Sequence, residues 1–326
     1  MADHPQQHHV EQQPLQQRKQ QQPDPAAALR RVLEVVRSGQ LDPLLEFCPD
    51  EVIDKLLALR KETGSTEQVH FEDIVRASSD GEGTPFLDTY SLRNLVMAAP
   101  SSVQLLSAMH ISPEKYLQRC AIVAPSGEEC VLTFSAALQE VQECQYRGPP
   151  LLSKKWMLQG VSGECNSDEL PSHPSPSFPP EAVVEAQLAA LREGRVASVF
   201  AHASPENKAS TGPVEKFAAM LNTNPLYSPL MRHATAETVQ RLQPSETTYM
   251  EVIRITPAAP QTDGAASGSS SSSNASGKRG SSKQQQQQPL IFMWILSRQS
   301  ENSAWSNCWM TDAVRPMSSI PAEFTR

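Results

Sequence analysis

The sequence predicts an α+β protein built from two domains in tandem. An apolar strand, a polar break and a second strand that contains Trp-Met occur at 129–139 with 154–161, and again at 289–298 with 305–314. A repeat at domain-length spacing indicates a duplicated fold. The 326 residues of the chain suit two domains of ordinary size, each able to bury its own core.

Helical patterns recur in the same order. Residues 36–50 match 191–205, and each predicts the end of an amphipathic helix, a Gly and a short second helix. Gly is favoured there because it accepts the left-handed conformation that closes a last turn. A third block, 106–116, matches 229–239 and aligns His110 with His233. Three blocks in one order predict the same fold twice.

Each half begins with a predicted helix after a proline, whose fixed φ suits a first helical turn. Helices are expected at 26–38 and 49–59 in the first half, and at 181–191 and 212–220 in the second. Strands of the second half are expected at 237–242, 248–255, 289–298 and 305–314.

Composition divides the chain into domains and connecting segments. A Gln/His-rich tail has too few apolar residues to offset its ordering entropy, and a Pro-rich stretch predicts a semi-extended linker. A Gly/Ser/Gln-rich insertion predicts a disordered loop. We therefore expect a tail at 1–24, a first domain at 25–163, a linker at 164–179, and a second domain at 180–326 with its loop at 258–288.

Charge and hydropathy exclude several classes of protein. The net charge of −8 argues against nucleic-acid or anionic-membrane binding, since both need a basic surface. The longest apolar run, 290–296, is far shorter than the ~18 residues of a membrane span. The N-terminus lacks a signal-peptide pattern. We expect an intracellular, cytoplasmic protein, with the chloroplast (an atypical transit peptide) or the nucleus as alternatives.

No motif predicts a metal or a cofactor. The six cysteines follow no zinc-ligand spacing, so we expect reduced thiols packed as small apolar residues. The chain also lacks a phosphate-binding Gly-rich loop, a Gly-x-Ser-x-Gly elbow and a His-Glu-x-x-His helix. Nucleotide-dependent, serine-hydrolase and zinc-protease chemistries are therefore not expected.

The second half, without its loop, resembles a known group of folds. The residues that carry the resemblance are Val184-x-x-Gln187-Leu-x-Ala-Leu191, Phe200-x-x-Ala-Ser-Pro205, Thr211-Gly-Pro213 with Phe217 and Met220, and Trp309-Met-x-Asp-x-Val314. This pattern is similar to the nuclear transport factor two-like superfamily, also called ketosteroid-isomerase-like or cystatin-like, and more narrowly to domain of unknown function 4864. The first half resembles it only through the repeat and lacks the Thr-Gly-Pro element.

The resemblance implies tandem cone-shaped domains, each a curved antiparallel sheet wrapped on helices. Members of the superfamily are either small-molecule isomerases and dehydratases or non-enzymatic binding modules, and a shared fold does not decide between them. Because such domains commonly pair through their sheets, the resemblance also implies that the two halves form an internal pseudo-dimer.

An enzyme of this kind would need a carboxylate or His as general base in an apolar pocket. Within the repeat, Asp312 aligns with Gln159 and His202 with Phe47, so both are specific to one copy; His110 and His233 suit a structural role. Asp312 followed by Arg315 also fits a simple surface ion pair. The candidate catalytic residues are Asp312, His202 and Tyr249, and the candidate ligand-binding residues are Trp305, Trp294 and Glu251.

Aromatic residues at strand spacing usually fill a core. Trp309, repeated as Trp156, is expected in the core, whereas Trp305 has no counterpart and is free to line a pocket. The function we expect is that of a non-catalytic binding or scaffold protein for a protein partner or a small apolar ligand. The alternative is an isomerase- or dehydratase-like enzyme in the C-terminal domain.

Overall fold

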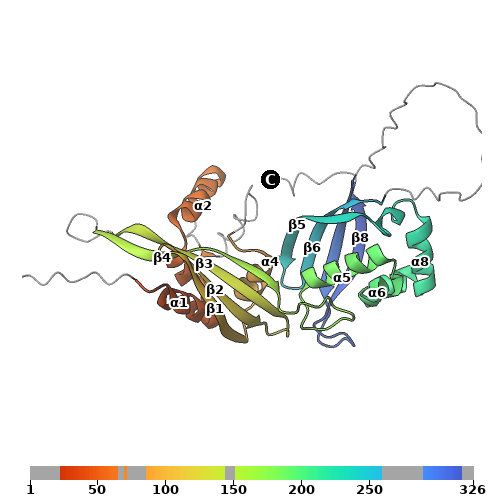
Figure 1. Cartoon of the computed structure of the whole chain (residues 1–326), viewed down its shortest axis with the longest axis horizontal. Coiled ribbons are helices and arrows are strands. Elements are labelled where there is room, and N and C mark those ends of the chain that lie inside the picture. The colour runs from red at the N-terminus through yellow and green to blue at the C-terminus, as the bar shows by residue number, and fades with distance from the viewer. Residues whose placement is uncertain (1–22, 65–69, 72–85, 144–150, 259–288, 318–326) are drawn as a thin grey trace, which may run out of the picture.

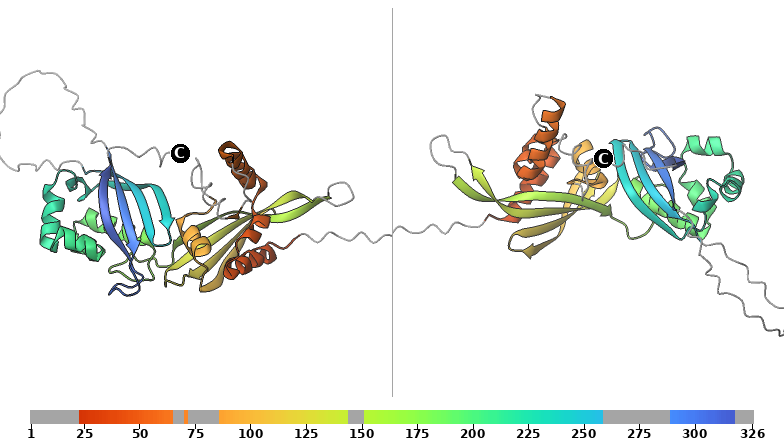
Figure 2. Two further views of the ribbon diagram at one scale, coloured as in Figure 1. Left: turned by 180° about the vertical axis from the view of Figure 1, so that it is seen from behind. Right: turned by 90° about the horizontal axis from the view of Figure 1, so that it is seen from above.

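The computed structural model describes residues 23–64, 70–71, 86–143, 151–258 and 289–317. The protein is α+β, with two four-stranded antiparallel sheets of order β1-β2-β3-β4 and β5-β6-β7-β8. The two sheets and their helices lie side by side along the long axis of the molecule (Figures 1 and 2). The predicted N-terminal tail, except for residues 23 and 24, and all but residue 258 of the predicted loop lie outside the described residues.

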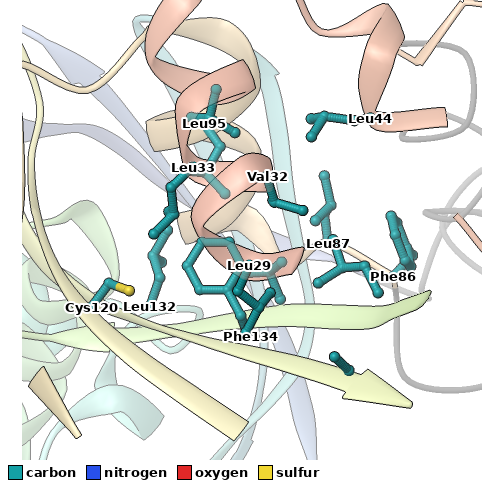
Figure 3. Close-up of a cluster of buried hydrophobic side chains, with 14 of the residues drawn as sticks. Leu29, Val32, Leu33, Leu44, Phe86, Leu87, Leu95, Cys120, Leu132 and Phe134 are labelled. Atoms are coloured by element: carbon teal, nitrogen blue, oxygen red, sulfur yellow. The ribbon is translucent and has the colours of Figure 1, made fainter. Parts of the chain in front are cut away.

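The first half begins with a helix whose apolar face covers its sheet. Asp24 caps that helix by accepting from the backbone N–H of Ala26, and Gly39 ends it at φ 71°. Leu29 and Leu33 point from the helix toward Phe134 and Leu132 of the sheet, and Val32 points toward Leu87 (Figure 3). The elements are α1 (Pro25–Ser38), η1 (Asp42–Phe47), α2 (Asp50–Thr63), α4 (Thr89–Ser91), η2 (Leu92–Met97), β1 (Ser102–Ser112), β2 (Lys115–Val123), β3 (Glu129–Glu143) and β4 (Leu151–Cys165).

In the second half, α5 lies across the sheet (Figure 1). Val183, Val184 and Leu191 of α5 are buried with Phe292 and Trp294 of the sheet. The elements are α5 (Pro180–Glu193), α6 (Val196–Ala201), α7 (Pro205–Thr211), α8 (Val214–Thr223), η3 (Ser228–Leu230), β5 (Thr235–Ser245), β6 (Thr248–Thr256), β7 (Leu290–Arg298) and β8 (Trp309–Met317). Among the described residues, no helix is long and apolar enough to cross a membrane.

The last strand of each sheet carries a bulge at the same place. In β4 the register steps from Gly160↔Ser135 to Leu158↔Ala136, which leaves Gln159 unpaired. In β8 it steps from Ala313↔Ile295 to Thr311↔Leu296, which leaves Asp312 unpaired. Gln159 and Asp312 therefore occupy corresponding positions, as their sequence alignment predicts. Trp156 and Trp309, three residues earlier, are both buried, as expected.

The alignment of His110 with His233 is wrong. His110 lies within β1 opposite Tyr116, whereas His233 follows η3 and precedes β5. In the register of the two sheets, Gln243 of β5 takes the place of His110. The residue before His110 pairs with the third residue of β2, and the residue before Gln243 pairs with the third residue of β6. The sequence match between 106–116 and 229–239 was therefore a coincidence of similar residues in different elements.

The boundaries at the final strand and at the linker also differ from those predicted. The final strand starts at Trp309, because residues 300–307 form turns and Asn307 has a left-handed φ of 59°. Trp305 and Asn307 are consequently not strand residues, and the face predicted for them does not apply. At the linker, β4 continues to Cys165. The Pro-rich segment then packs on the first domain, where the backbone carbonyl of Ser177 accepts a hydrogen bond from Glu129 N at 2.9 Å.

Candidate functional site

Glu251 and Tyr249 lie on the helix-covered face of the second sheet, with Trp294 opposite Glu251 on the neighbouring strand. The Glu251 carboxylate accepts from Tyr249 Oη at 2.7 Å, from Thr238 Oγ1 at 2.7 Å and from Arg241 Nε at 3.3 Å. Burial raises the pKa of Tyr249, and the nearby carboxylates raise it further. Tyr249 therefore stays protonated and donates, so this group forms a closed network rather than a free acid–base pair.

His202 and Asp312 are held in separate contacts. His202 is buried at the end of α6, where its Nδ1 lies 3.1 Å from Ser198 O and its backbone carbonyl accepts from Thr311 N. Burial lowers its pKa, so the ring is neutral near pH 7. Half-buried Asp312 accepts from Ser297 Oγ at 3.0 Å. Within the described residues, no hydrogen bond or ion pair joins Asp312 to His202, Tyr249 or Arg315.

The two other tryptophans separate into a core residue and a surface residue. Trp294 is buried edge-on to Phe292, which makes it a packing residue. Trp305 remains exposed, and Lys208 Nζ lies 5.5 Å from its ring centroid while donating to Ala201 O. Trp305 is therefore available to a partner, whereas Trp294 is not.

A buried ionic cluster, absent from the sequence predictions, connects the two halves. Its centre is Arg93 of η2, whose side chain is 2% exposed. Arg93 Nε lies 2.9 Å from both carboxylate oxygens of Glu128, and Arg93 Nη2 lies 2.8 Å from Glu181 Oε2 at the start of α5. We call Arg93, Glu128, Glu181, Gln243 and Trp309 the junction.

The first half supplies Glu128 from the tight turn between β2 and β3. Gly127, at φ 91°, closes this turn by donating to Ala124 O. Asn94 Nδ2 donates to Glu128 Oε1 at 3.0 Å, and Trp309 Nε1 of the second half donates to Glu128 Oε2 at 3.1 Å. The carboxylate of Glu128 thus has donors from both halves.

The second half supplies Glu181 and Gln243. Glu181 follows Pro180 in the first turn of α5, where the helix dipole stabilises a negative charge. It accepts from Thr89 Oγ1 of the first half at 2.5 Å. Gln243 Oε1 accepts from Arg93 Nη1 at 2.7 Å. The rings of Tyr90, Tyr249 and Trp309 have centroids 5.6–5.9 Å from the guanidinium carbon, within cation–π range.

The junction contains one cation and two carboxyl groups, and these two groups have opposite pKa shifts. Burial opposes ionisation of Glu128, but the charge and hydrogen bonds of Arg93, with Asn94 and Trp309, hold its pKa below the usual value. Burial raises the pKa of Glu181 despite Arg93, and the negative Glu128 adds to this. Glu128 is therefore the permanent counter-ion of Arg93, while Glu181 is the group that titrates more easily.

The two carboxyl groups should respond differently to neutral substitution. The lowered pKa of Glu128 contributes stability above its unfolded value of 4.5, which is lost as pH falls through the folded pKa. The raised pKa of Glu181 contributes stability below 4.5, which is lost as pH rises through the folded pKa. Urea unfolding at pH 8 should show Glu128→Gln less stable by about 3 kcal/mol and Glu181→Gln nearly unchanged. Equal losses at pH 8 would contradict this assignment.

The two corresponding tryptophans provide a matched test of the contact between the halves. Trp309 Nε1 donates to the Glu128 carboxylate, whereas Trp156 Nε1 donates to the neutral carbonyl of Pro23 at 2.8 Å. Hydrogen bonds to charged groups contribute about 1.5–3 kcal/mol and neutral ones about 0.5–1.5. We expect Trp309→Phe to lower the unfolding free energy more than Trp156→Phe does. The opposite order in urea titrations would contradict the charged contact.

Sequence reasoning missed Arg93, Glu128 and Gln243 and gave Glu181 no role beyond its helix. One pattern points to Arg93: it is the only Lys, Arg, Asp or Glu between Asp88 and Glu114. A single charge in such a run is expected either at the surface or in a buried pair. Its hydrogen-bond partners lie up to 150 residues away in the chain, so no local spacing identifies them.

Comparison with family models matches part of the second half. Residues 179–261 match the family described as Domain of unknown function (DUF4864). This range contains α5 to β6, and therefore Glu181, Gln243 and the Glu251 network, but it excludes β8 with Asp312 and Trp309. No curated protein and no solved structure matches the chain.

Proposed function

We propose that this chain is a non-catalytic binding or scaffold protein whose two halves form one unit through the junction. The proposal rests on the hydrogen bonds that buried polar groups of the second half make. Glu251 has three donors from its own sheet, and Glu181, Gln243 and Trp309 bind the first half. Glu251 and Tyr249, which an isomerase could direct at a substrate, are here engaged with other protein groups, whereas His202 is engaged through Nδ1 alone.

We further propose that each half is a nuclear transport factor two-like cone that holds a protein partner or a small apolar ligand. The shared strand order, the shared bulge and the helix across each sheet support this fold. In this account the halves form an internal pair through Arg93 rather than through their open sheet faces. The compartment we propose is the cytoplasm, which fractionation of a tagged full-length chain would test.

The alternative, an isomerase- or dehydratase-like enzyme, depends on Asp312. Its position at a bulge is the observation that favours it, because bulges often redirect a side chain next to an active site. Against it, Asp312 has a hydrogen bond from Ser297 and none from the other candidates, His202 and Tyr249, among the described contacts.

The test compares Asp312→Asn with Arg93→Met in cells that lack the native gene. Asn keeps the acceptor for Ser297 but removes the carboxylate that a general base needs. A scaffold predicts full rescue by Asp312→Asn and loss of rescue, together with loss of co-purified partners, in Arg93→Met at matched soluble levels. Loss of rescue in Asp312→Asn, with partners still bound, would replace the scaffold proposal by the enzyme.

A further inference from the structure

The outer strand of the first sheet has an unusually exposed apolar edge. β1 lies at one end of the strand order, and none of the described strands pairs with its outer side. Along Ser102–Ser112, only Val103 and Ser112 are partly buried. Four large apolar side chains are about half exposed, at 51%, 47%, 55% and 53% for Leu105, Leu106, Met109 and Ile111. Both faces of this strand therefore present apolar surface.

Free strand edges normally carry features that prevent pairing with another chain, such as charges, prolines or a covering element. The corresponding strand of the second sheet has all three. β5 contains Glu237, Arg241 and Pro244, and it contacts α4 and η2 of the first half. None of its described side chains is a large exposed hydrophobic residue. In the part of the chain that the structure describes, β5 is thus protected and β1 is not.

Among the described residues, β1 has none of these three protections. It shares with β5 two bulges, between Leu105 and Ala108 and between His110 and Ser112. It contains no proline, and no Lys, Arg, Asp or Glu occurs anywhere in residues 94–113. This uncharged stretch is notable in a chain with a net charge of −8, which repels its own copies at long range. A contact between two copies would be least opposed here.

We propose that β1 is the contact between two copies of this chain, in which two β1 strands pair antiparallel about a twofold axis. The free backbone groups of an antiparallel edge match those of a reversed copy, so one strand provides both sides of the interface. The apolar side chains of both faces would cover one another across the axis. Because the surface is uncharged, it fits its own copy without the opposite charges that a different partner would need to match. This contact is independent of the junction.

The proposal is tested by sedimentation equilibrium of the full chain. We expect a dimer of micromolar or tighter affinity that persists in high salt, because backbone pairing and apolar burial are little screened. Leu105→Lys with Met109→Lys should weaken dimerisation at least tenfold through like charges across the axis. Thr235→Lys, at an exposed position of β5, is the matched control and should remain dimeric.

The outcomes separate the possible occupants of this edge. Both Lys positions are about half exposed, so the double variant should still unfold in one cooperative transition, below that of the dimeric control only by the stability that dimerisation adds. A wild-type chain that is monomeric at high concentration would overturn the proposal and leave the edge to another protein or to a segment of the same chain. A dimer that survives both Lys substitutions would place the contact elsewhere and would equally overturn it.

Discussion

Arg93→Met is expected to lower the free energy of unfolding by about 3–5 kcal/mol at pH 7, the cost of leaving buried charges without their partner. Arg93 is 2% exposed and donates to Glu128, Glu181, Gln243 and the carbonyl of Thr89. Without it, two carboxyl groups remain buried beside one another and must bind protons to fold. The loss should therefore increase as pH rises, which urea titrations at pH 6 and pH 8 would show.

The matched control is an arginine in an exposed pair. Arg254 and Glu237 lie 3.4 Å apart with side chains 43% and 61% exposed, so Arg254→Met should cost less than about 0.5 kcal/mol. Neutralising the carboxyl groups in the same chain, with Glu128→Gln and Glu181→Gln added to Arg93→Met, should restore much of the stability. A loss in Arg93→Met no greater than that in Arg254→Met would contradict the role of the junction.

Gly163→Ala is expected to be the most damaging change of a single methyl group. A Cβ at this position of β4 would lie 2.2 Å from Cβ and 2.6 Å from Cγ of Tyr90, and 2.9 Å from Cδ2 of Leu132. Tyr90 belongs to α4, which leads directly into η2 and Arg93. The extra atom must push α4 off the sheet, so we expect a loss of about 3 kcal/mol, the upper part of the range for overpacking.

A neighbouring residue provides the control for this steric argument. Ser162 on the same strand is exposed, and Ser162→Ala should change the unfolding free energy by less than about 0.5 kcal/mol. Because Gly163→Ala displaces the turn that carries Arg93, it should also weaken the contact between the halves in the manner of Arg93→Met. Thermal unfolding of Gly163→Ala that matches the wild type would show that α4 moves freely on β4, contrary to the packing described.

The helices and the main strands were predictable because local chemistry specifies them. Pro25 and Pro180 begin helices and Gly39 and Gly194 end them, all at the positions expected from the sequence. The burial of Trp156 and Trp309 followed from their repeated positions. The start of β8 was not predictable from alternation, since Trp305 and Trp309 have strand spacing but a left-handed turn at Asn307 separates them.

The site was less predictable, because long-range pairing determines it. Asp312 and His202 were candidate catalytic residues because of their residue types and because the first half has no equivalent of either. Each nevertheless hydrogen-bonds to a different residue and not to the other candidate. The sequence drew attention to Glu251 and Tyr249, although their mutual hydrogen bond depends on the strand they share. Hydrogen bonds within the junction join residues as many as 181 positions apart, and the buried charge that requires partners becomes evident only after folding.

The central claim, that the junction fixes the two halves as one unit, is tested most directly by a distance measurement between them. Spin labels would be attached at Arg37→Cys on α1 and Glu206→Cys on α7, both exposed positions. Cys144 and Cys165 would be replaced by Ser, since the other four cysteines are buried. With labelled chains diluted in unlabelled protein, so that distances between two copies do not contribute, pulsed electron–electron double resonance should give one narrow distance distribution in the wild type and a broad one in Arg93→Met. A distribution that is already broad in the wild type, and unchanged by Arg93→Met, would contradict the account.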